Sequence, residues 1–176
     1  MLAKCNSPVK EEMRYFGLWK KAMSAYFVRL EEKTLERAKL VVSVSRHTHD
    51  LLKVVYGADS IVIQDAVDSQ RFHPEPKDGS TFRVVKRREN GFVQTKLSPE
   101  EYADRLNRAT YFVSDSPSEG FDLSLLEAMA SGCICKVRDI PAHRELEPHT
   151  RENALNFTWE KTAEATSKAY EEVLKC

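Results

Sequence analysis

The chain has 176 residues, of which 27 are Lys or Arg and 27 are Asp or Glu, so its net charge is zero with neutral histidines. This balance argues against a general nucleic-acid-binding role, which normally needs a basic surface. No apolar run approaches the roughly eighteen residues of a membrane-spanning helix. The N-terminal segment lacks the apolar centre of a secretory signal, so we expect a cytoplasmic protein.

Hydrophobic periodicity predicts helices that alternate with short strands. The predicted helices span residues 11–39, 46–55, 99–108, 123–132 and 159–174. The predicted strands span residues 40–44, 60–63, 82–85, 110–114 and 133–137. The remaining segments are predicted as a linker at 65–80, a polar turn at 86–96 and irregular chain at 138–151. This alternation predicts an α/β fold with a parallel sheet, in which ligands bind beyond the carboxyl ends of the strands.

Three hydroxyl side chains are predicted to cap these helices. Ser45 precedes the helix at 46–55, and Thr158 precedes the final helix. Ser98 precedes a helix with Pro at its first position and Glu101 at its third, which is the pattern of a capping box.

Residues 116–132 read SPSEGFDLSLLEAMASG and join a buried strand to a helix through a turn. Glu119 lies in the turn and Glu127 on the helix, about 6 Å further along its axis. The first turn of a helix has unpaired N–H groups that bind phosphate, and carboxylates bind sugar hydroxyls. The pair therefore suits a sugar nucleotide, although two glutamates beside a helix start are usually only solvated charges.

This segment resembles the donor site of retaining glycosyltransferases of family 4, also called group 1, whose pattern is P-S-x-x-E-G-F-G-L-x-x-L-E-A-M-A-x-G. Residues 36–57, 61–74 and 156–174 resemble, in the right order, three other segments of that family. The family has the GT-B fold. The resemblance therefore implies a Rossmann-like parallel sheet with flanking helices, corresponding to a reduced donor lobe plus the tail of the acceptor lobe.

The length implies a condensed or truncated relative, because two Rossmann-like lobes need roughly 300 residues. By comparison with the family, we expect segments to be missing before residue 1, between 74 and 110, and after 145. We expect residues 1–78 to be the remnant of the acceptor lobe and linker. Residues 79–176 would be the reduced donor lobe, packed with the first part as one unit.

The resemblance implies transfer of a hexose, with retention, from a UDP- or GDP-sugar to an acceptor. By position, Glu119 would contact the transferred sugar and Glu127 the ribose, while Arg88 could match the family's diphosphate-binding arginine. The residues whose backbone would receive the diphosphate are Gly120, Phe121, Leu123 and Ser124. No metal or other cofactor is expected.

Several residues depart from the family pattern. Asp122 replaces a glycine, and its carboxylate, although a good helix cap, would occupy the anion site and repel a diphosphate. The family's lysine has no clean counterpart, since Lys96 is a weak substitute. Two further departures are Asp115 for proline and Asp65-Ala66 for Asn-Gly. These changes keep open the alternative of an inactive remnant or pseudoenzyme that serves as a binding or interaction module.

The cysteines and histidines form no metal-ligand pattern, so we interpret them as structural. They are Cys5, Cys133, Cys135, Cys176, His47, His49, His73, His143 and His149. A dinucleotide-binding or response-regulator-like domain is a weaker interpretation, because the chain has no G-x-G-x-x-G. The amphipathic helix at 11–39 predicts a homo-oligomer or a partner lobe.

Overall fold

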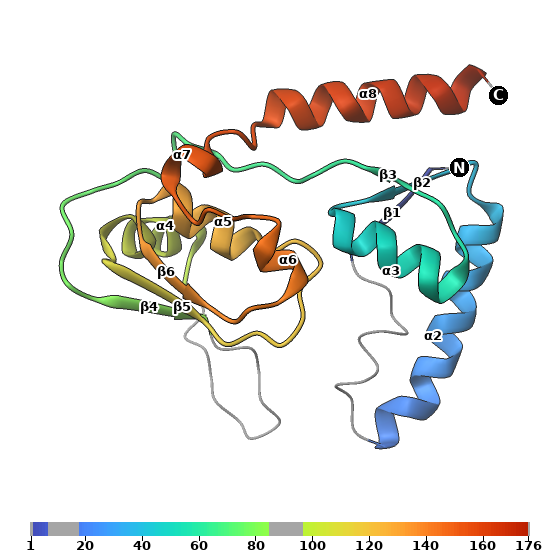
Figure 1. Ribbon diagram of the computed structural model, residues 1–176, viewed down its shortest axis with the longest axis horizontal. Helices are drawn as coiled ribbons and strands as arrows, with labels where there is room; N and C mark the ends of the chain where they lie inside the picture. Colours follow the sequence, from blue (N-terminus) through green and yellow to red (C-terminus); the bar gives the residue numbers. More distant parts are fainter. Residues whose placement is uncertain (1, 7–17, 85–96, 176) are drawn as a thin grey trace. The chain divides into compact units, whose positions relative to one another are not determined.

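The computed structural model describes residues 2–6, 18–84 and 97–175 (Figure 1). The chain forms two compact units, one made of Met1–Gln64 with Glu160–Cys176 and the other of Asp65–Trp159. Each unit contains a three-stranded sheet whose strands are all parallel. The predicted α/β class with parallel sheets and flanking helices is therefore confirmed. The assignment of residues 1–78 and 79–176 to the remnants of two family lobes concerns evolutionary origin, so it stays a prediction.

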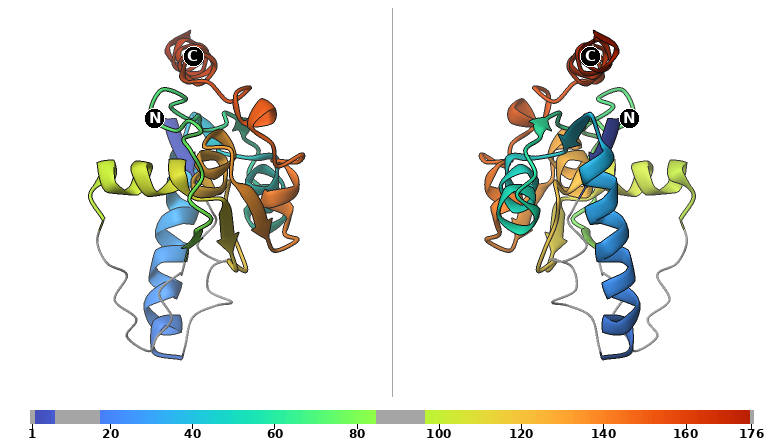
Figure 2. Two further views of the ribbon diagram at one scale, coloured as in Figure 1. Left: turned by 90° about the vertical axis from the view of Figure 1, so that its left-hand side faces the viewer. Right: turned by 90° about the vertical axis from the view of Figure 1, so that its right-hand side faces the viewer.

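The first unit places its sheet between helices on both faces. The sheet order is β1 (Leu2–Cys5), β2 (Leu40–Ser43) and β3 (Ile61–Val62). The helices are α2 (Leu18–Arg37), α3 (Arg46–Tyr56) and α8 (Trp159–Lys175). Figure 2 shows α8 end-on and α2 along its length, so these two helices run in different directions.

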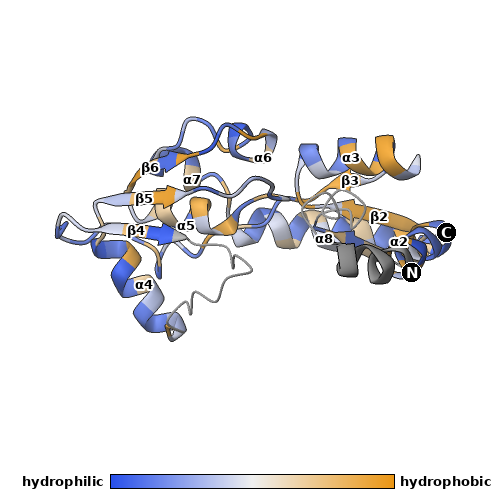
Figure 3. Ribbon diagram, turned by 90° about the horizontal axis from the view of Figure 1, so that it is seen from below, coloured by the Kyte–Doolittle hydropathy of each residue, from blue (hydrophilic) through white to orange (hydrophobic). Residues whose placement is uncertain are grey.

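Successive valines of β2 face opposite sides of the sheet, as in any strand. Val41 packs with Leu52 of α3 and with Leu35 of α2. Val42 packs with Ala169 of α8, which covers the other face. The apolar residues of β2 accordingly have the orange colour of hydrophobic residues in Figure 3. The Thr162 hydroxyl of α8 also donates a 2.9 Å hydrogen bond to the carbonyl of residue 64, where the first unit ends.

The second unit covers one face of its sheet. The sheet order is β4 (Thr81–Val84), β5 (Tyr111–Ser114) and β6 (Ile134–Val137). The helices are α4 (Pro99–Arg108), α5 (Leu123–Ala130), α6 (Pro141–Arg144) and α7 (Arg151–Ala154). Right-handed crossovers in a sheet that adds strands in one direction place α4 and α5 on the same face. The largest fully buried side chains there are Phe112, Leu106, Leu125, Leu126 and Met129.

Asn107, at the end of α4, fixes the linker before β4. Its side-chain nitrogen donates to the backbone carbonyl of Arg71 at 2.9 Å. Its side-chain oxygen accepts from the backbone amide of His73 at 3.1 Å and from the hydroxyl of Ser131 at 2.7 Å. The Lys77 ammonium donates to the carbonyls of Asn107 and Ser131. The linker is therefore attached to the C-terminal ends of both α4 and α5.

The predicted caps of α3 and α4 are confirmed. The Ser45 hydroxyl accepts from the amide of Thr48 at 2.9 Å. Ser98 and Glu101 form a complete capping box, in which each side chain accepts from the other residue's amide. The cap predicted at Thr158 stays a prediction.

Two features differ from the sequence-based expectations. Strand β1 was not predicted, because LAKC is short and mixes polar with apolar residues. The stretch 138–151, predicted to be irregular, contains α6 and the first residue of α7. Phe27 and Leu30 of α2 are 47% and 42% exposed. In the described parts of the chain, no helix has the length and apolar character needed to cross a bilayer.

Candidate functional site

The turn between β5 and α5 lies beyond the carboxyl end of the central strand of the second sheet, where parallel sheets bind ligands. Most of α5 is buried, and only Leu123, Ser124 and Glu127 are not. Residues three and four apart share a helix face, so these side chains form one stripe that begins at the helix start. Leu123 is 42% exposed, and Glu127 lies one turn further along. Glu127 therefore lies on the only side of α5 that reaches the surface.

Asp122 is the N-cap of α5, as predicted. Its Oδ1 accepts from the amide of Leu125 at 3.1 Å and from the hydroxyl of Ser124 at 2.7 Å. Its backbone is left-handed, with φ 70° and ψ 73°. This region favours glycine, and aspartate tolerates it better than most residues. The capping hydrogen bonds therefore hold Asp122 in a conformation that costs free energy.

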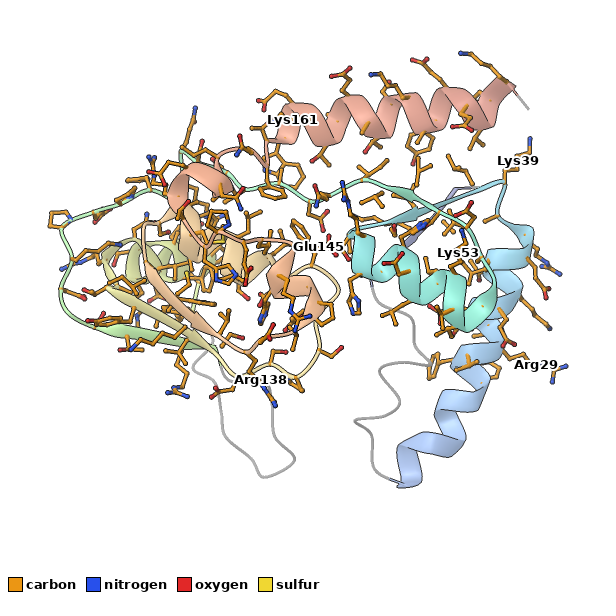
Figure 4. The ribbon with its side chains drawn as sticks, in the orientation of Figure 1. Arg29, Lys39, Lys53, Arg138, Glu145 and Lys161 are labelled. Carbon is orange, nitrogen blue, oxygen red and sulfur yellow. The ribbon has the colours of Figure 1, made fainter. Side chains whose placement is uncertain are left out.

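The second carboxylate oxygen of Asp122 faces His143 of α6. Nε2 of His143 lies 2.8 Å from Oδ2 of Asp122, and the two side chains are 1% and 2% exposed. Nδ1 of His143 lies 2.7 Å from the carbonyl oxygen of Arg138. Arg138 and Glu145, labelled in Figure 4, lie on either side of α6 along the chain. With a carbonyl at one nitrogen and a carboxylate at the other, both nitrogens donate, and His143 is an imidazolium paired with an ionised Asp122.

The electrostatic environment supports these charged states. Burial lowers the pKa of His143. Its hydrogen bonds to Asp122 and Arg138, together with the charges of Asp122 and Glu119, raise the pKa by more than burial lowers it, so the net pKa lies above the ordinary value. Burial raises the pKa of Asp122, but hydrogen bonds from His143, Ser124 and the Leu125 amide bring it below its ordinary value.

The predicted effect of Asp122 on the anion site is therefore only partly correct. The carboxylate does take the Leu125 amide, which is one of the first donors of the helix. However, it is buried and paired with His143 instead of projecting toward a ligand. Its negative charge is consequently paired with a positive one inside the protein.

Glu127 is held by α4. The Tyr102 hydroxyl donates a 2.8 Å hydrogen bond to Oε2 of Glu127. Burial raises the pKa of Glu127, and the Tyr102 hydrogen bond and the charge of Arg71 oppose this, leaving it above its ordinary value. Burial and the charge of Glu127 raise the pKa of Tyr102. The tyrosine ring packs edge-on against Phe72 and Phe82, which fixes the position of its hydroxyl.

The turn itself contains the other predicted residues. Glu119 and Gly120 are half-buried. The charge of Glu119 raises the pKa of His143. Phe121 is 4% exposed and its ring packs against that of Phe157 at 5.7 Å between centroids, so it belongs to the core. Arg88 lies outside the described residues.

Glu119 thus precedes α5 in the turn, and Glu127 lies about one helical turn into α5. The charge of Asp122 raises the pKa of Glu127, and that of Glu119 raises the pKa of His143, the partner of Asp122. Among the residues that the structure describes, no group of three His, Cys, Asp or Glu side chains is arranged to hold a metal ion.

The sequence did not reveal His143 and Tyr102 as parts of this site. His143 was interpreted as structural, and it lies 21 residues from Asp122. Tyr102 lies 25 residues from Glu127, on a different helix. No local pattern links either residue to its partner, since both contacts form only when separate elements pack together.

Comparison with known proteins supports the fold. No protein-family model matches the sequence, and no curated protein matches it. Among solved structures, sucrose-phosphate synthase from Thermosynechococcus elongatus is similar, with a TM-score of 0.72 and 15% sequence identity. The match covers 99% of this chain and 68% of that one. At this identity, the likeness shows a shared fold.

Proposed function

We propose that the chain is a glycosyltransferase, or the donor-binding part of one, that transfers a hexose from a nucleoside-diphosphate sugar to an acceptor with retention. One observation carries this proposal. Glu119 lies in the turn after the central strand β5, at the carboxyl edge of a parallel sheet, and Glu127 lies one turn into the helix that follows, on its only surface-reaching side. The structural likeness to sucrose-phosphate synthase and the resemblance of residues 116–132 to family 4 support it.

Each part of the helix start would bind a different part of the donor. The amides of Leu123 and Ser124 have no acceptor within the helix and would donate to the diphosphate. Glu127, held by Tyr102, would accept from the ribose hydroxyls, and Glu119 would accept from the hexose. The oxygen of an acceptor hydroxyl would bond to the anomeric carbon as the bond from that carbon to the diphosphate oxygen breaks on the same face, and the hydroxyl proton would pass to the departing diphosphate. Positioning and electrostatic stabilisation would supply most of the rate.

A ligand screen tests the binding step. The full chain is heated with UDP, GDP, ADP and their hexose derivatives, and the shift in melting temperature is measured. A ligand at a hundredfold excess over its dissociation constant stabilises by about 2.7 kcal/mol, so a donor of modest affinity registers. Release of free nucleotide in the presence of candidate acceptors then measures turnover.

Glu127→Gln tests the assignment of the ribose contact. We expect calorimetric affinity for the best nucleotide to fall about tenfold, because a hydrogen bond to a charged group is worth about 1.5–3 kcal/mol. Glu152→Gln, which changes an exposed carboxylate on α7, is the matched control and should bind normally. A folded Glu127→Gln protein with wild-type affinity for every nucleotide would contradict the proposal.

A second candidate is a binding module without turnover. It is favoured by one observation, the occupation of the Leu125 amide by the Asp122 carboxylate, since that donor is then lost to a phosphate. Such a chain would bind a nucleotide or nucleotide sugar yet release no free nucleotide with any acceptor. Detectable transfer or donor hydrolysis would eliminate this candidate.

A further inference from the structure

The ion pair of Asp122 and His143 lies at the proposed nucleotide site but has no part in the proposed transfer. Its members come from two elements, the cap of α5 and the short helix α6. Both side chains are almost completely inaccessible to solvent. A buried ion pair adds little net stability, because desolvation of the two charges offsets their attraction. Stabilisation of the fold therefore does not explain why this ion pair lies at this position.

The backbone conformation of Asp122 also indicates that an aspartate is not needed here for the fold alone. A glycine would adopt its left-handed conformation without strain, and a serine or asparagine could cap the helix without a full charge. An aspartate adds a negative charge at a helix start that already has Glu119 and Glu127 nearby. The Leu125 amide and the Ser124 hydroxyl stabilise that charge, and a cation close to Asp122 neutralises it.

His143 is that cation. Its nitrogens contact Asp122 and the carbonyl of Arg138, and its own carbonyl oxygen lies 3.0 Å from Nε2 of His149. The imidazole is thus fixed from both sides, and α6 is fixed with it. The other charge that acts on the imidazole is that of Glu119.

We propose that His143 is a positioning residue for the nucleotide-binding turn: it holds the Asp122 carboxylate inward and neutralises it, so that the start of α5 accepts the diphosphate of a donor. This inference rests on the proposed function. It assigns His143 no contact with substrate. It predicts that binding depends on the balance of charge within the pair more than on either side chain alone.

The test uses the full chain with His143→Gln and the double variant D122N/H143Q. The single variant keeps a donor for Asp122 but removes the positive charge, so we expect calorimetric affinity for UDP or GDP to fall about tenfold at neutral pH. The double variant removes both charges, and affinity should recover to within about threefold of wild type. A role limited to folding would give no such recovery.

Two further measurements complete the test. Nucleotide affinity of the wild type should fall as the pH rises through the pKa of His143, while that of the double variant should not. NMR titration of the imidazole should give a pKa above the ordinary value, and Asp122→Asn should lower it. His73→Gln is the control for loss of an exposed histidine beside a carboxylate, since His73 lies 3.8 Å from Glu75.

The outcomes separate this inference from the function on which it rests. A folded His143→Gln protein with wild-type affinity, or a double variant as weak as the single one, overturns the role of His143 and leaves the nucleotide site intact. Failure of the wild type to bind any nucleotide overturns both. A His143 pKa that does not respond to Asp122→Asn shows that the pair itself is absent.

Discussion

The hydroxyl of Tyr102 on α4 and the carboxylate of Glu127 on α5 are joined by a 2.8 Å hydrogen bond. This bond connects the two helices that cover the second sheet, and it fixes one of the two acids proposed to bind the donor. Because burial raises the pKa of Glu127 while Tyr102 opposes that rise, the tyrosine also helps to keep the acid ionised.

Tyr102→Phe should therefore lower the stability of the protein and make Glu127 harder to ionise. We expect the free energy of unfolding to fall by about 1–2 kcal/mol, because a half-buried carboxylate loses a donor. The pKa of Glu127 should rise further. Urea denaturation and NMR titration measure the two effects. Tyr170→Phe on α8 is the control, because its ring is 53% exposed, and an equal loss there would contradict the explanation.

The Asp122–His143 pair should make stability depend on pH in a defined direction. The pKa of His143 is raised, so its contribution is complete below the ordinary value of 6.5 and is lost as pH rises through the folded-state pKa. The pKa of Asp122 is lowered, so its contribution is complete above 3.8 and is lost as pH falls through the folded-state pKa.

The pair should accordingly contribute most to the free energy of unfolding between about pH 3.8 and about pH 6.5, the ordinary pKa values of the two groups. Unfolding free energies of wild type and D122N/H143Q, measured by urea denaturation from about pH 4 to about pH 9, should diverge least at the alkaline end. A difference that grows above the ordinary histidine pKa would show that His143 is neutral in the folded protein.

Asn107→Ala should destabilise the second unit by about 2 kcal/mol or more, because it leaves buried polar groups of the linker and of α5 without their partner. Hydrogen exchange of the His73 amide should become faster, since Asn107 accepts its proton. Asn156→Ala, at an exposed position, is the control. Unchanged exchange at His73 would mean that the linker is held by other contacts.

Gly132→Ala should cost more than Gly79→Ala. Both glycines have left-handed backbones, with φ of 73° and 79°, so both substitutions are strained by about 1–2 kcal/mol. A Cβ on Gly132 would also lie 3.1 Å from Pro74, whereas one on Gly79 would meet open space. The difference between the two melting temperatures measures this contact, and equal losses would show that Pro74 moves aside freely.

The sequence predicted the elements that depend on nearby residues. Ser98 and Glu101 identify the start of α4 because a capping box lies within four positions. Strand β1 depends instead on pairing with β2, which lies far along the chain, and its own residues carry no strand pattern. The α/β class followed from the alternation of such local patterns.

The same distinction applies to the candidate site. The turn that contains Glu119 and the helix that contains Glu127 are adjacent in sequence, so their relation could be predicted from spacing. The inward orientation of Asp122 could not, because it depends on His143, which α6 brings from beyond β6. A segment predicted as irregular chain thus contributes the cation at the helix start.

The first unit is built from both ends of the chain, and this affects how it forms. Ala169 of α8 completes one face of the sheet against Val42 and Ile63, with residues 65–159 inserted between. During synthesis on the ribosome, that face stays uncovered until α8 emerges. The inserted unit is available to fold earlier, which reverses the usual order in which the N-terminal domain folds first.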